Sequence, residues 1–354
     1  VRKERRYDMV ILLNRNARQD DVREIVKVLE SYSLATHFSK GNERTIIGVV
    51  GDTSRVKREN IQILPGVERI IPITDPYKLA SKTFKQDPDV YDLGKGILLG
   101  AGHFVQMAGP CSIESYEQLY ETAKAVRKSG ARILRGGAYK PRTSPYSFQG
   151  TGIEGLRWMR EIADELDMLV VSEVLSELDI EAMLPYVDIF QIGTRNAQNF
   201  RLLKSVGQAG KPVLLKRGMA ETIEEWLSSS EYILSQGNYK VILCERGIRT
   251  FEKAYRATLD IGCIPVLREK THLPVIVDPS HAAGDYRLVP SLALAAAAAG
   301  ADGLIIEVHP NPPAAMSDAA QQLTFKQYAR LSRGIRAVCE TLGRKAEDAA
   351  DASE

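Results

Sequence analysis

Eight short apolar segments recur after residue 103, and helix-length stretches separate most of them. Near-continuous apolar strands that alternate with helices are typical of a parallel sheet buried on both faces. Eight such units in ~245 residues favour a closed (β/α)8 TIM barrel. An open doubly wound sheet is the structural alternative, but no GxGxxG follows the first strand to support it. Thr222 followed by Glu225 predicts a capping box before one of the helices. The eight segments are FVQMAGPC, ARILRGG, MLVVSEV, DIFQIGT, KPVLLKRG, KVILCERG, LPVIVDPSH and DGLIIEVHP.

The chain before this repeat follows a different pattern, which predicts a separate domain. A length of 354 residues exceeds one ordinary core, so about two domains are expected. MVILLN, THFSK, RTIIGVVGD and ERIIPIT are strand candidates, and helical spacing runs from Gln19 to Leu34. The order is βαββαβ, the ferredoxin-like pattern. The expected parts are residues 1–75 (the ferredoxin-like domain), 76–102 (a linker and a short β-hairpin), 103–345 (the barrel) and 346–354 (a disordered tail).

Composition and charge exclude several classes of partner and location. The formal net charge is only +2, with 26% charged residues, so nothing points to nucleic acid or to a membrane surface. No apolar run reaches ~18 residues, so no spanning helix is expected. The first residues, VRKERRYD, contain no apolar signal region. Four cysteines lie far apart without a CxxC pair, which fits a reducing compartment with free thiols. We therefore expect a cytoplasmic globular protein.

Charged or metal-binding side chains follow every predicted barrel strand. The carboxyl ends of barrel strands share one mouth, so these side chains are expected to meet there. A single lysine at a strand end is usually a solvated rim residue. Several cations gathered without anions, however, would repel one another and suffer desolvation, and arginine suits bidentate contacts with carboxylate and phosphate. The pattern predicts a strongly anionic ligand. The cations are Arg135, Lys140, Arg195, Lys216 and Arg246.

A second group combines one thiol, one imidazole and two carboxylates. Cys111 ends the first predicted strand, His281 the seventh and Glu307 the eighth, and these strands are neighbours in a closed barrel. Asp318 lies in the loop beyond. Mixed sulfur, nitrogen and oxygen ligands suit a first-row divalent ion such as Mn, Fe, Co or Zn, and are poor for Ca or a closed structural zinc site. Taken alone, Cys111 or His281 is more commonly a buried packing residue, so the joint placement carries this prediction. The remaining cysteines and histidines are interpreted as packing, surface or structural residues: Cys244, Cys263, Cys339, His37, His103 and His272.

Seven stretches of the barrel region carry a family resemblance: AGPCSIES, ILRGGAYKPRTSPYSFQG, QIGTRNAQNF, PVLLKRGM, CERGIRT, DPSHAAG and IIEVHP. Together they resemble DAHP synthase, a family that makes 3-deoxy-D-arabino-heptulosonate 7-phosphate from phosphoenolpyruvate and erythrose 4-phosphate. They occur in the family's order over residues 103–340. The chain is most similar to the short-loop form with an N-terminal ferredoxin-like domain, which residues 1–75 match by pattern more than by motif.

The resemblance implies a role for each candidate residue. It implies phosphoenolpyruvate as the anionic ligand of the five cations. It also implies a divalent metal that acts as a Lewis acid on the aldehyde oxygen. The metal ligands would be Cys111, His281, Glu307 and Asp318.

The KPRTS signature of the resemblance covers Lys140, Pro141, Arg142, Thr143 and Ser144. Here Arg142 and Thr143 would hold the aldose phosphate, and Pro141 would stiffen the loop. Lys140 would act on the enolate side of the reaction. His309, which follows the eighth strand, is the candidate for proton transfer.

Two alternative functions stay open. KDO 8-phosphate synthase, which uses arabinose 5-phosphate, shares the barrel and the phosphoenolpyruvate site but has KANR where this chain has KPRT. Its metal-independent form has Asn in place of the Cys, so Cys111 and Pro141 both favour erythrose 4-phosphate. The other alternative is a non-catalytic sensor of phosphate ligands. A complete metal set argues against it.

Residues 1–75 contain none of the residues assigned to chemistry, so they must serve another purpose. A structural cap or an oligomer contact is the simpler interpretation. The resemblance implies a feedback sensor that binds Tyr or Phe and closes the barrel mouth. We also expect a homo-oligomer, with a tetramer favoured.

Overall fold

The computed structural model describes residues 9–14, 16–40, 45–51, 53, 56–72, 76–140, 146 and 148–346. The chain divides into two compact units, Val1–Lys78 and Leu79–Glu354, and each is considered by itself. The predicted site residues Pro141, Arg142, Thr143 and Ser144 lie outside the described residues.

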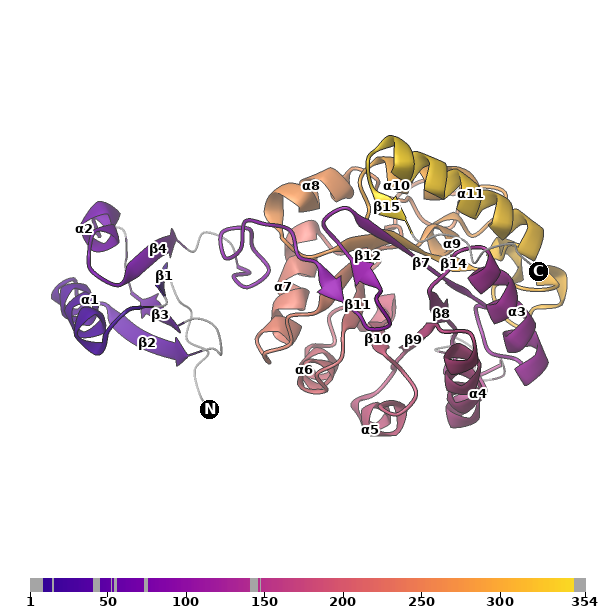
Figure 1. Ribbon diagram of the computed structural model, residues 1–354, viewed down its shortest axis with the longest axis horizontal. Helices are drawn as coiled ribbons and strands as arrows, with labels where there is room; N and C mark the ends of the chain where they lie inside the picture. The colour runs from indigo at the N-terminus through magenta and orange to yellow at the C-terminus, as the bar shows by residue number, and fades with distance from the viewer. Residues whose placement is uncertain are drawn as a thin grey trace. The chain divides into compact units, whose positions relative to one another are not determined.

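The first unit is a four-stranded antiparallel sheet with two helices. Its elements are β1 (Met9–Leu13), α1 (Gln19–Ser31), β2 (Ala35–Lys40), β3 (Thr45–Val50), α2 (Arg58–Gln62) and β4 (Val67–Pro72). The strand order is β2-β3-β1-β4, and β1 pairs antiparallel with both of its neighbours (Figure 1). The apolar stripe of α1 repeats every four residues, so Ile25 and Leu29 are fully buried together with the strand residues Ile11 and Ile47. The predicted ferredoxin-like fold is therefore confirmed.

The second unit contains a closed barrel of eight parallel strands. The strands are β7 (His103–Gly109), β8 (Ile133–Arg135), β9 (Leu169–Glu173), β10 (Ile189–Ile192), β11 (Val213–Lys216), β12 (Val241–Glu245), β13 (Val275–Val277) and β14 (Gly303–Glu307). Neighbours pair in sequence order, and β14 pairs back with β7, from Gly303 opposite Val105 to Glu307 opposite Gly109. This last pairing closes the barrel, which confirms the predicted fold and excludes the open doubly wound sheet.

Helices surround the barrel strands. They are α3 (Tyr116–Lys128), α4 (Gly152–Glu165), α5 (Ile180–Met183), α6 (Phe200–Gln208), α7 (Ile223–Leu234), α8 (Cys263–Lys270), α9 (Pro279–Ala283), α10 (Val289–Ala298) and α11 (Phe325–Thr341), with short 3-10 turns η2 (Glu177–Asp179), η3 (Thr194–Asn196), η4 (Pro312–Ala314) and η5 (Ala319–Gln321) and a last strand β15 (Lys345–Ala346). Figure 1 shows α3 to α7 side by side around the strands. The predicted capping box begins α7, because Thr222 Oγ1 accepts from the N–H of Glu225 (3.2 Å) and Glu225 Oε2 accepts from the N–H of Thr222 (2.8 Å).

A short hairpin closes the end of the barrel at which the strands begin. β5 (Tyr91–Asp92) pairs antiparallel with β6 (Leu98–Leu99). Ile97 and Tyr91 belong to the buried cluster that fills the barrel interior, and the hydroxyl of Tyr91 donates to the carbonyl oxygen of Val241, the first residue of β12 (3.2 Å). The hairpin therefore contributes to the barrel core.

A buried polar cluster fastens the first segment of the second unit to the barrel. Asp89 accepts a hydrogen bond from the hydroxyl of Tyr91 (3.0 Å) and pairs with His272 Nδ1 (2.7 Å) and with Lys85. His272 Nε2 lies 2.7 Å from the carbonyl oxygen of Leu79. His272, which precedes β13, thus holds two points of this segment, in agreement with a structural role.

The Asp89 cluster should make stability depend on pH. Burial would raise the pKa of Asp89, but the hydrogen bonds and charges of His272 and Lys85 outweigh it and hold the pKa below its usual value. The folded pKa is therefore below the unfolded one, so the contribution of Asp89 is complete above the unfolded value of about 3.9 and is lost as the pH falls through the folded pKa. We expect Asp89→Asn to lower the free energy of unfolding by about 1.5–3 kcal/mol at neutral pH. Urea unfolding across a pH series measures this. A difference from the wild type that does not shrink in acid would contradict it.

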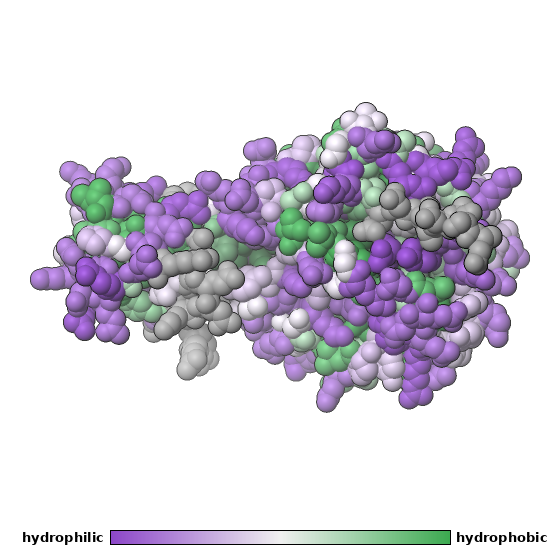
Figure 2. Space-filling view, viewed as in Figure 1, coloured by the Kyte–Doolittle hydropathy of each residue, from purple (hydrophilic) through white to green (hydrophobic). Residues whose placement is uncertain are grey.

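The surface carries no extended apolar region on the face seen in Figure 2, where hydrophilic side chains prevail and apolar ones occupy smaller areas. Large exposed apolar side chains such as Leu178 and Phe251 lie in separate parts of the chain. Among the described residues, none of the helices has the length and apolar character needed to cross a membrane.

Candidate active site

Most of the predicted site residues lie at one end of the barrel. Because all eight strands are parallel, their carboxyl ends share one mouth. Arg135, Lys216 and Glu307 are the last residues of β8, β11 and β14. Cys111 follows β7 by two residues, and His281 lies on α9 directly after β13. Strand direction therefore brings together residues that are far apart in sequence.

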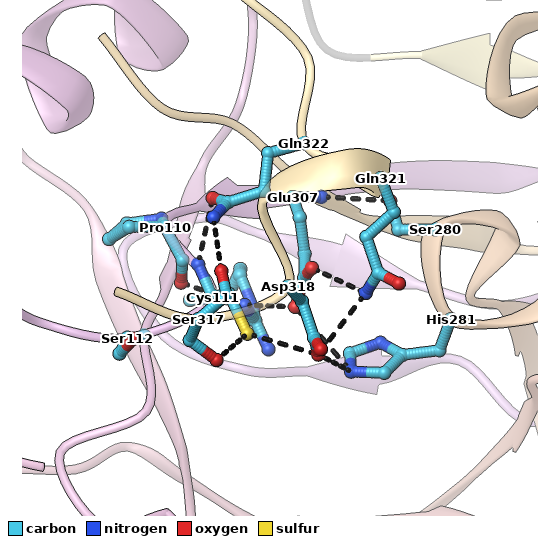
Figure 3. Close-up of polar contacts among 12 residues, drawn as sticks. Pro110, Cys111, Ser112, Ser280, His281, Glu307, Ser317, Asp318, Gln321 and Gln322 are labelled. Carbon is cyan, nitrogen blue, oxygen red and sulfur yellow. Dashed lines mark hydrogen bonds and ion pairs between the residues drawn. The ribbon is translucent and has the colours of Figure 1, made fainter. Parts of the chain in front are cut away.

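Four donor atoms converge at this mouth (Figure 3). One donor atom each from Cys111, His281, Glu307 and Asp318 lies within 4.8 Å of the other three. Cys111 Sγ is 3.5 Å from Asp318 Oδ2. His281 Nε2 is 3.5 Å from Glu307 Oε1 and 3.8 Å from Asp318 Oδ2. The structure thus brings together all four residues predicted as metal ligands.

The chemistry of these donors fits a divalent transition metal. Asp278 Oδ2 lies 2.7 Å from Nδ1 of His281, which leaves Nε2 directed at the other donors. A carboxylate behind a ligating histidine is the usual outer-shell arrangement at metal sites. One thiol, one imidazole and two carboxylates combine soft and hard donors, as first-row transition ions prefer. These four residues are therefore able to hold such an ion.

Burial controls the protonation of the donors. Burial and the neighbouring Glu307 carboxylate raise the pKa of the Cys111 thiol to about 12. Burial also lowers the pKa of His281, against the opposing charge of Asp278. Burial would raise the pKa of Glu307, but the charges of His281 and Arg135 outweigh this effect and lower the pKa. A divalent cation would supply the positive charge that a Cys111 thiolate needs.

Two predicted cations contact these donors directly. Arg135 Nη1 donates to Oε1 of Glu307 (2.9 Å) and to the carbonyl oxygen of Pro110 (2.7 Å). Lys140 Nζ lies 3.1 Å from the sulfur of Cys111 and 2.9 Å from its carbonyl oxygen. Arg135 and Lys140 therefore contact the donor cluster and also border the space beside it.

A polar pocket opens beside the donor cluster. The Nε atom of Arg135 is buried and has no hydrogen-bond partner in the part of the chain that the structure describes. A buried, unpaired donor on a cation at the wall of a pocket favours an anionic ligand. The pocket is lined by Arg135, Gly136, Gly137, Lys140, Val171, Ser172, Glu173, Gln191, Lys216 and His281.

The remaining two predicted cations lie outside this lining. Arg246 is buried, and its guanidinium donates to the carbonyl oxygens of His281 (3.4 Å) and Gly247 (3.2 Å). Burial lowers the pKa of Arg246 against the opposing charge of Asp278. Arg195 lies on η3 and is exposed. The structure therefore brings Arg246 next to the donor cluster but does not bring Arg195 into the pocket lining.

His309 also lies outside the pocket lining. Its Nδ1 accepts a hydrogen bond from the N–H of Asn311 (3.1 Å), and its Nε2 is 3.3 Å from Oε2 of Glu114. Neighbouring residues thus occupy both ring nitrogens, and proton transfer by His309 stays a prediction.

Asp278 connects the pocket to the donor cluster, a role that the sequence interpretation did not assign. Its Oδ2 lies 2.5 Å from Nζ of Lys216 and 2.7 Å from Nδ1 of His281. Burial opposes ionisation, but His281 and Lys216 hold the pKa of Asp278 well below its usual range. A local signal was present, since Asp before Pro279 is typical of a helix N-cap. Asp278 Oδ1 indeed accepts from the N–H of His281 (2.9 Å).

Glu173 is a second pocket residue without an assigned role. Gln191 Nε2 donates to its Oε2 (3.4 Å). A Cβ atom at Gly193 would lie 1.9 Å from Glu173 Oε1, so a side chain at this position would displace the carboxylate from its present place. The absence of a side chain at Gly193, after β10, therefore leaves space for the side chain of Glu173 from β9.

A closed parallel barrel with this donor cluster and a cation-lined pocket defines a (β/α)8-barrel enzyme whose mouth can hold a divalent metal. Residues 80–341 match the model of the DAHP synthetase I family, and residues 9–75 match the DAHP synthase ferredoxin-like domain. The chain belongs to the DAHP synthetase I family.

Known relatives show how far the similarity extends. The chain is 51% identical to phospho-2-dehydro-3-deoxyheptonate aldolase of Thermotoga maritima over 337 residues, which cover 95% of this chain and 99% of the relative. A crystal structure of the Thermotoga maritima enzyme, also named DAHP synthase, matches with a TM-score of 0.77 at 50% identity and covers 96% of this chain and 99% of that chain. The 2-dehydro-3-deoxyphosphooctonate aldolase of Acidithiobacillus ferrooxidans is 33% identical over 243 residues, covering 63% of this chain and 85% of the relative.

Proposed function

We propose that the chain condenses phosphoenolpyruvate with D-erythrose 4-phosphate and water to give 3-deoxy-D-arabino-heptulosonate 7-phosphate and phosphate. This reaction is the first step of the shikimate pathway to aromatic amino acids. The observation that carries the proposal is the pocket in which Arg135, Lys140 and Lys216 adjoin the four-donor cluster. Near full-length similarity to a phospho-2-dehydro-3-deoxyheptonate aldolase supports it.

The pocket cations bind phosphoenolpyruvate in this proposal. Its phosphate and carboxylate supply the negative charge that balances Arg135 and Lys216, while Arg246 and Arg195 extend the cationic surface. Arg135 offers the ligand a buried, unpaired Nε. Holding both substrates in attack geometry contributes several powers of ten in rate.

The donor cluster holds the divalent metal, for which Mn, Fe, Co and Zn are the candidates. When bound, the ion supplies Lewis-acid polarisation of the aldehyde oxygen. Glu307 and Asp318 bring negative charge, because neighbouring cations keep the pKa of each below its usual value despite burial. Lys140, 3.1 Å from the sulfur of Cys111, stabilises the thiolate form of that ligand.

The reaction forms one carbon–carbon bond and releases one phosphate. C3 of phosphoenolpyruvate attacks the aldehyde carbon, water adds to C2, and phosphate leaves. Lys140 lies between the donor cluster and the pocket. We therefore assign to it the donation of a hydrogen bond or a proton on the enolate side of the reaction. His309 is the second candidate for proton transfer. Arg142 and Thr143, within the segment Lys140 to Ser144, bind the phosphate of erythrose 4-phosphate, with Pro141 limiting the motion of that loop.

Product analysis tests this function against both alternatives. With Mn²⁺, phosphoenolpyruvate and erythrose 4-phosphate, the chain should release one phosphate for each phosphoenolpyruvate consumed and should use arabinose 5-phosphate far less well. Similar kcat/KM values for the two sugars would favour a 2-dehydro-3-deoxyphosphooctonate aldolase. Binding without phosphate release from either mixture would favour a sensor.

The ferredoxin-like unit is proposed to bind Tyr or Phe as a feedback effector, within a cytoplasmic homo-oligomer for which a tetramer is favoured. It contains none of the residues assigned to chemistry, and it matches a domain model of its own. A coupling of ~1–3 kcal/mol would change substrate binding roughly 5- to 150-fold.

Deletion of residues 1 to 78 should separate regulation from catalysis. We expect the remaining barrel to stay active and to lose its response to Tyr and Phe, because the pocket and donors lie within Leu79–Glu354. Steady-state rates with and without each amino acid measure this. If neither amino acid changes the rate of the full-length enzyme, the unit has a structural role instead.

A further inference from the structure

Gln321 is a buried amide that contacts two of the proposed metal ligands. It ends η5, the short turn that begins directly after Asp318, and it is 2% exposed. Its Nε2 donates to Oε2 of Glu307 (2.7 Å) and to Oδ2 of Asp318 (3.5 Å). Figure 3 shows the Gln321 side chain directed at both carboxylates. One amide group therefore links the two acidic donors.

Arg256 determines the orientation of the Gln321 amide, that is, which side its oxygen and its nitrogen face. Arg256 Nη1 donates to Oε1 of Gln321 (2.9 Å) and lies 3.5 Å from Oδ1 of Asp318. A guanidinium can only donate and a carboxylate can only accept. The oxygen of the amide must therefore face Arg256, and its N–H groups must face Glu307 and Asp318.

Neighbouring residues contact both oxygens of each acidic donor. On Glu307, Arg135 contacts Oε1 and Gln321 contacts Oε2. On Asp318, Arg256 lies near Oδ1, and Gln321 and Cys111 lie near Oδ2. Two carboxylates this close repel each other when both are ionised. Donated hydrogen bonds reduce that repulsion before a metal binds.

The backbone of Asp318 also requires support from its neighbours. Its φ is 47°, in the left-handed region that a residue with a side chain rarely adopts. Such a conformation persists only where the surrounding contacts hold it. Gln321 follows within the turn that begins at this residue, and its N–H donates to the carbonyl oxygen of Asp318 (3.2 Å).

We propose that Gln321, oriented by Arg256, is a positioning residue that arranges Glu307 and Asp318 for the divalent metal. The inference rests on the proposed metal site and extends it to two residues outside the ligand set. A neutral amide suits this place, because a lysine would compete with the metal for the carboxylates and a glutamate would add a third negative charge. Loss of an outer-shell partner typically costs 10- to 100-fold in metal affinity.

The test is a Mn²⁺ titration of the full-length chain, in which the electron paramagnetic resonance signal measures the concentration of free Mn²⁺. Gln321→Ala should raise the Kd for Mn²⁺ about 10- to 100-fold, and Arg256→Ala should shift it in the same direction. Co²⁺ absorption should report an altered ligand geometry in both variants. At saturating Mn²⁺, the KM for phosphoenolpyruvate should stay at its wild-type value in Gln321→Ala, since Gln321 does not line the pocket.

Gln106→Ala is the matched control. Gln106 is also a buried glutamine with one donated and one accepted side-chain bond, to Ser332 (3.0 Å) and from Tyr328 (3.2 Å), but it contacts none of the four donors. Its loss should leave the Kd for Mn²⁺ unchanged.

The outcomes separate the positioning role of Gln321 from the existence of the metal site. Wild-type Mn²⁺ affinity in Gln321→Ala would overturn the inference while leaving the metal site intact. If Gln321→Ala does not fold, Arg256→Ala decides, and unchanged affinity in that variant overturns the proposal. If Cys111→Ser binds Mn²⁺ as the wild type does, the proposed metal site itself fails, and the inference fails with it.

Discussion

Replacing Cys111 with Ser is expected to remove metal binding and turnover together. The substitution deletes the softest donor of the set and the sulfur that Lys140 Nζ approaches at 3.1 Å. Loss of a ligand should exceed the ~10- to 100-fold cost that is typical of losing an outer-shell partner. The Kd for Mn²⁺ and kcat/KM, measured on the same preparation, should therefore change in parallel. A chelator should silence the wild type, and Mn²⁺ or Co²⁺ should restore it.

Cys339→Ser is the matched control for this prediction. Cys339 is also buried and free, but it lies on α11 and, within the part of the chain that the structure describes, belongs to no group of potential metal ligands. Its substitution should leave metal affinity and rate unchanged. Full activity of Cys111→Ser in metal-free buffer would show that the thiol and the ion play no part in the reaction.

Replacing Asp278 with Asn is expected to damage stability, metal binding and substrate binding at once. The Asp278 carboxylate is 1% exposed and pairs with both Lys216 Nζ (2.5 Å) and His281 Nδ1 (2.7 Å). An amide cannot balance the lysine charge, and removing one partner of a buried pair costs about 3–5 kcal/mol. We expect the free energy of unfolding to fall by that amount, the Kd for Mn²⁺ to rise about 10- to 100-fold, and the KM for phosphoenolpyruvate to rise as well.

Asp302→Asn separates the effect on the site from the effect on stability. Asp302 is a buried carboxylate paired with Arg268 (2.5 Å) and Arg344 (3.1 Å), and it precedes the first residue of β14, at the opposite end of the barrel from the site. Its substitution should cost similar stability without changing the Kd for Mn²⁺ or the KM for phosphoenolpyruvate. If Asp278→Asn shows only the stability loss, the carboxylate is a packing feature and does not connect the two parts of the site.

The fold was predictable because its signals are local and repeat. Seven of the eight barrel strands lie within their predicted apolar segments, as β11 (Val213–Lys216) lies within KPVLLKRG, and β7 begins one residue before its segment. The convergence of Cys111, His281 and Glu307 followed from topology, since β13 is adjacent to β14 and β7 pairs with β14 only when the barrel closes. Residue spacing along the chain carries no such information.

The supporting residues were not predictable because their roles depend on side-chain direction and loop shape. Asp278 has a local N-cap signal, but that signal does not reveal that the same carboxylate reaches Lys216. Gln321 reaches Glu307 from a turn that begins at Asp318, whose backbone is in the left-handed conformation. His309 lies two residues past β14, where its N–H donates to the carbonyl oxygen of Leu323 (2.9 Å) and strand alternation no longer gives the direction of the side chain.

We propose that Cys111, His281, Glu307 and Asp318 hold the metal on which the reaction depends. Anomalous diffraction from crystals grown with Mn²⁺ and phosphoenolpyruvate tests it most directly. We expect one strong peak among these four donors, with phosphoenolpyruvate against Arg135 and Lys216. A peak at any other place, or active crystals without a peak at these residues, would contradict it.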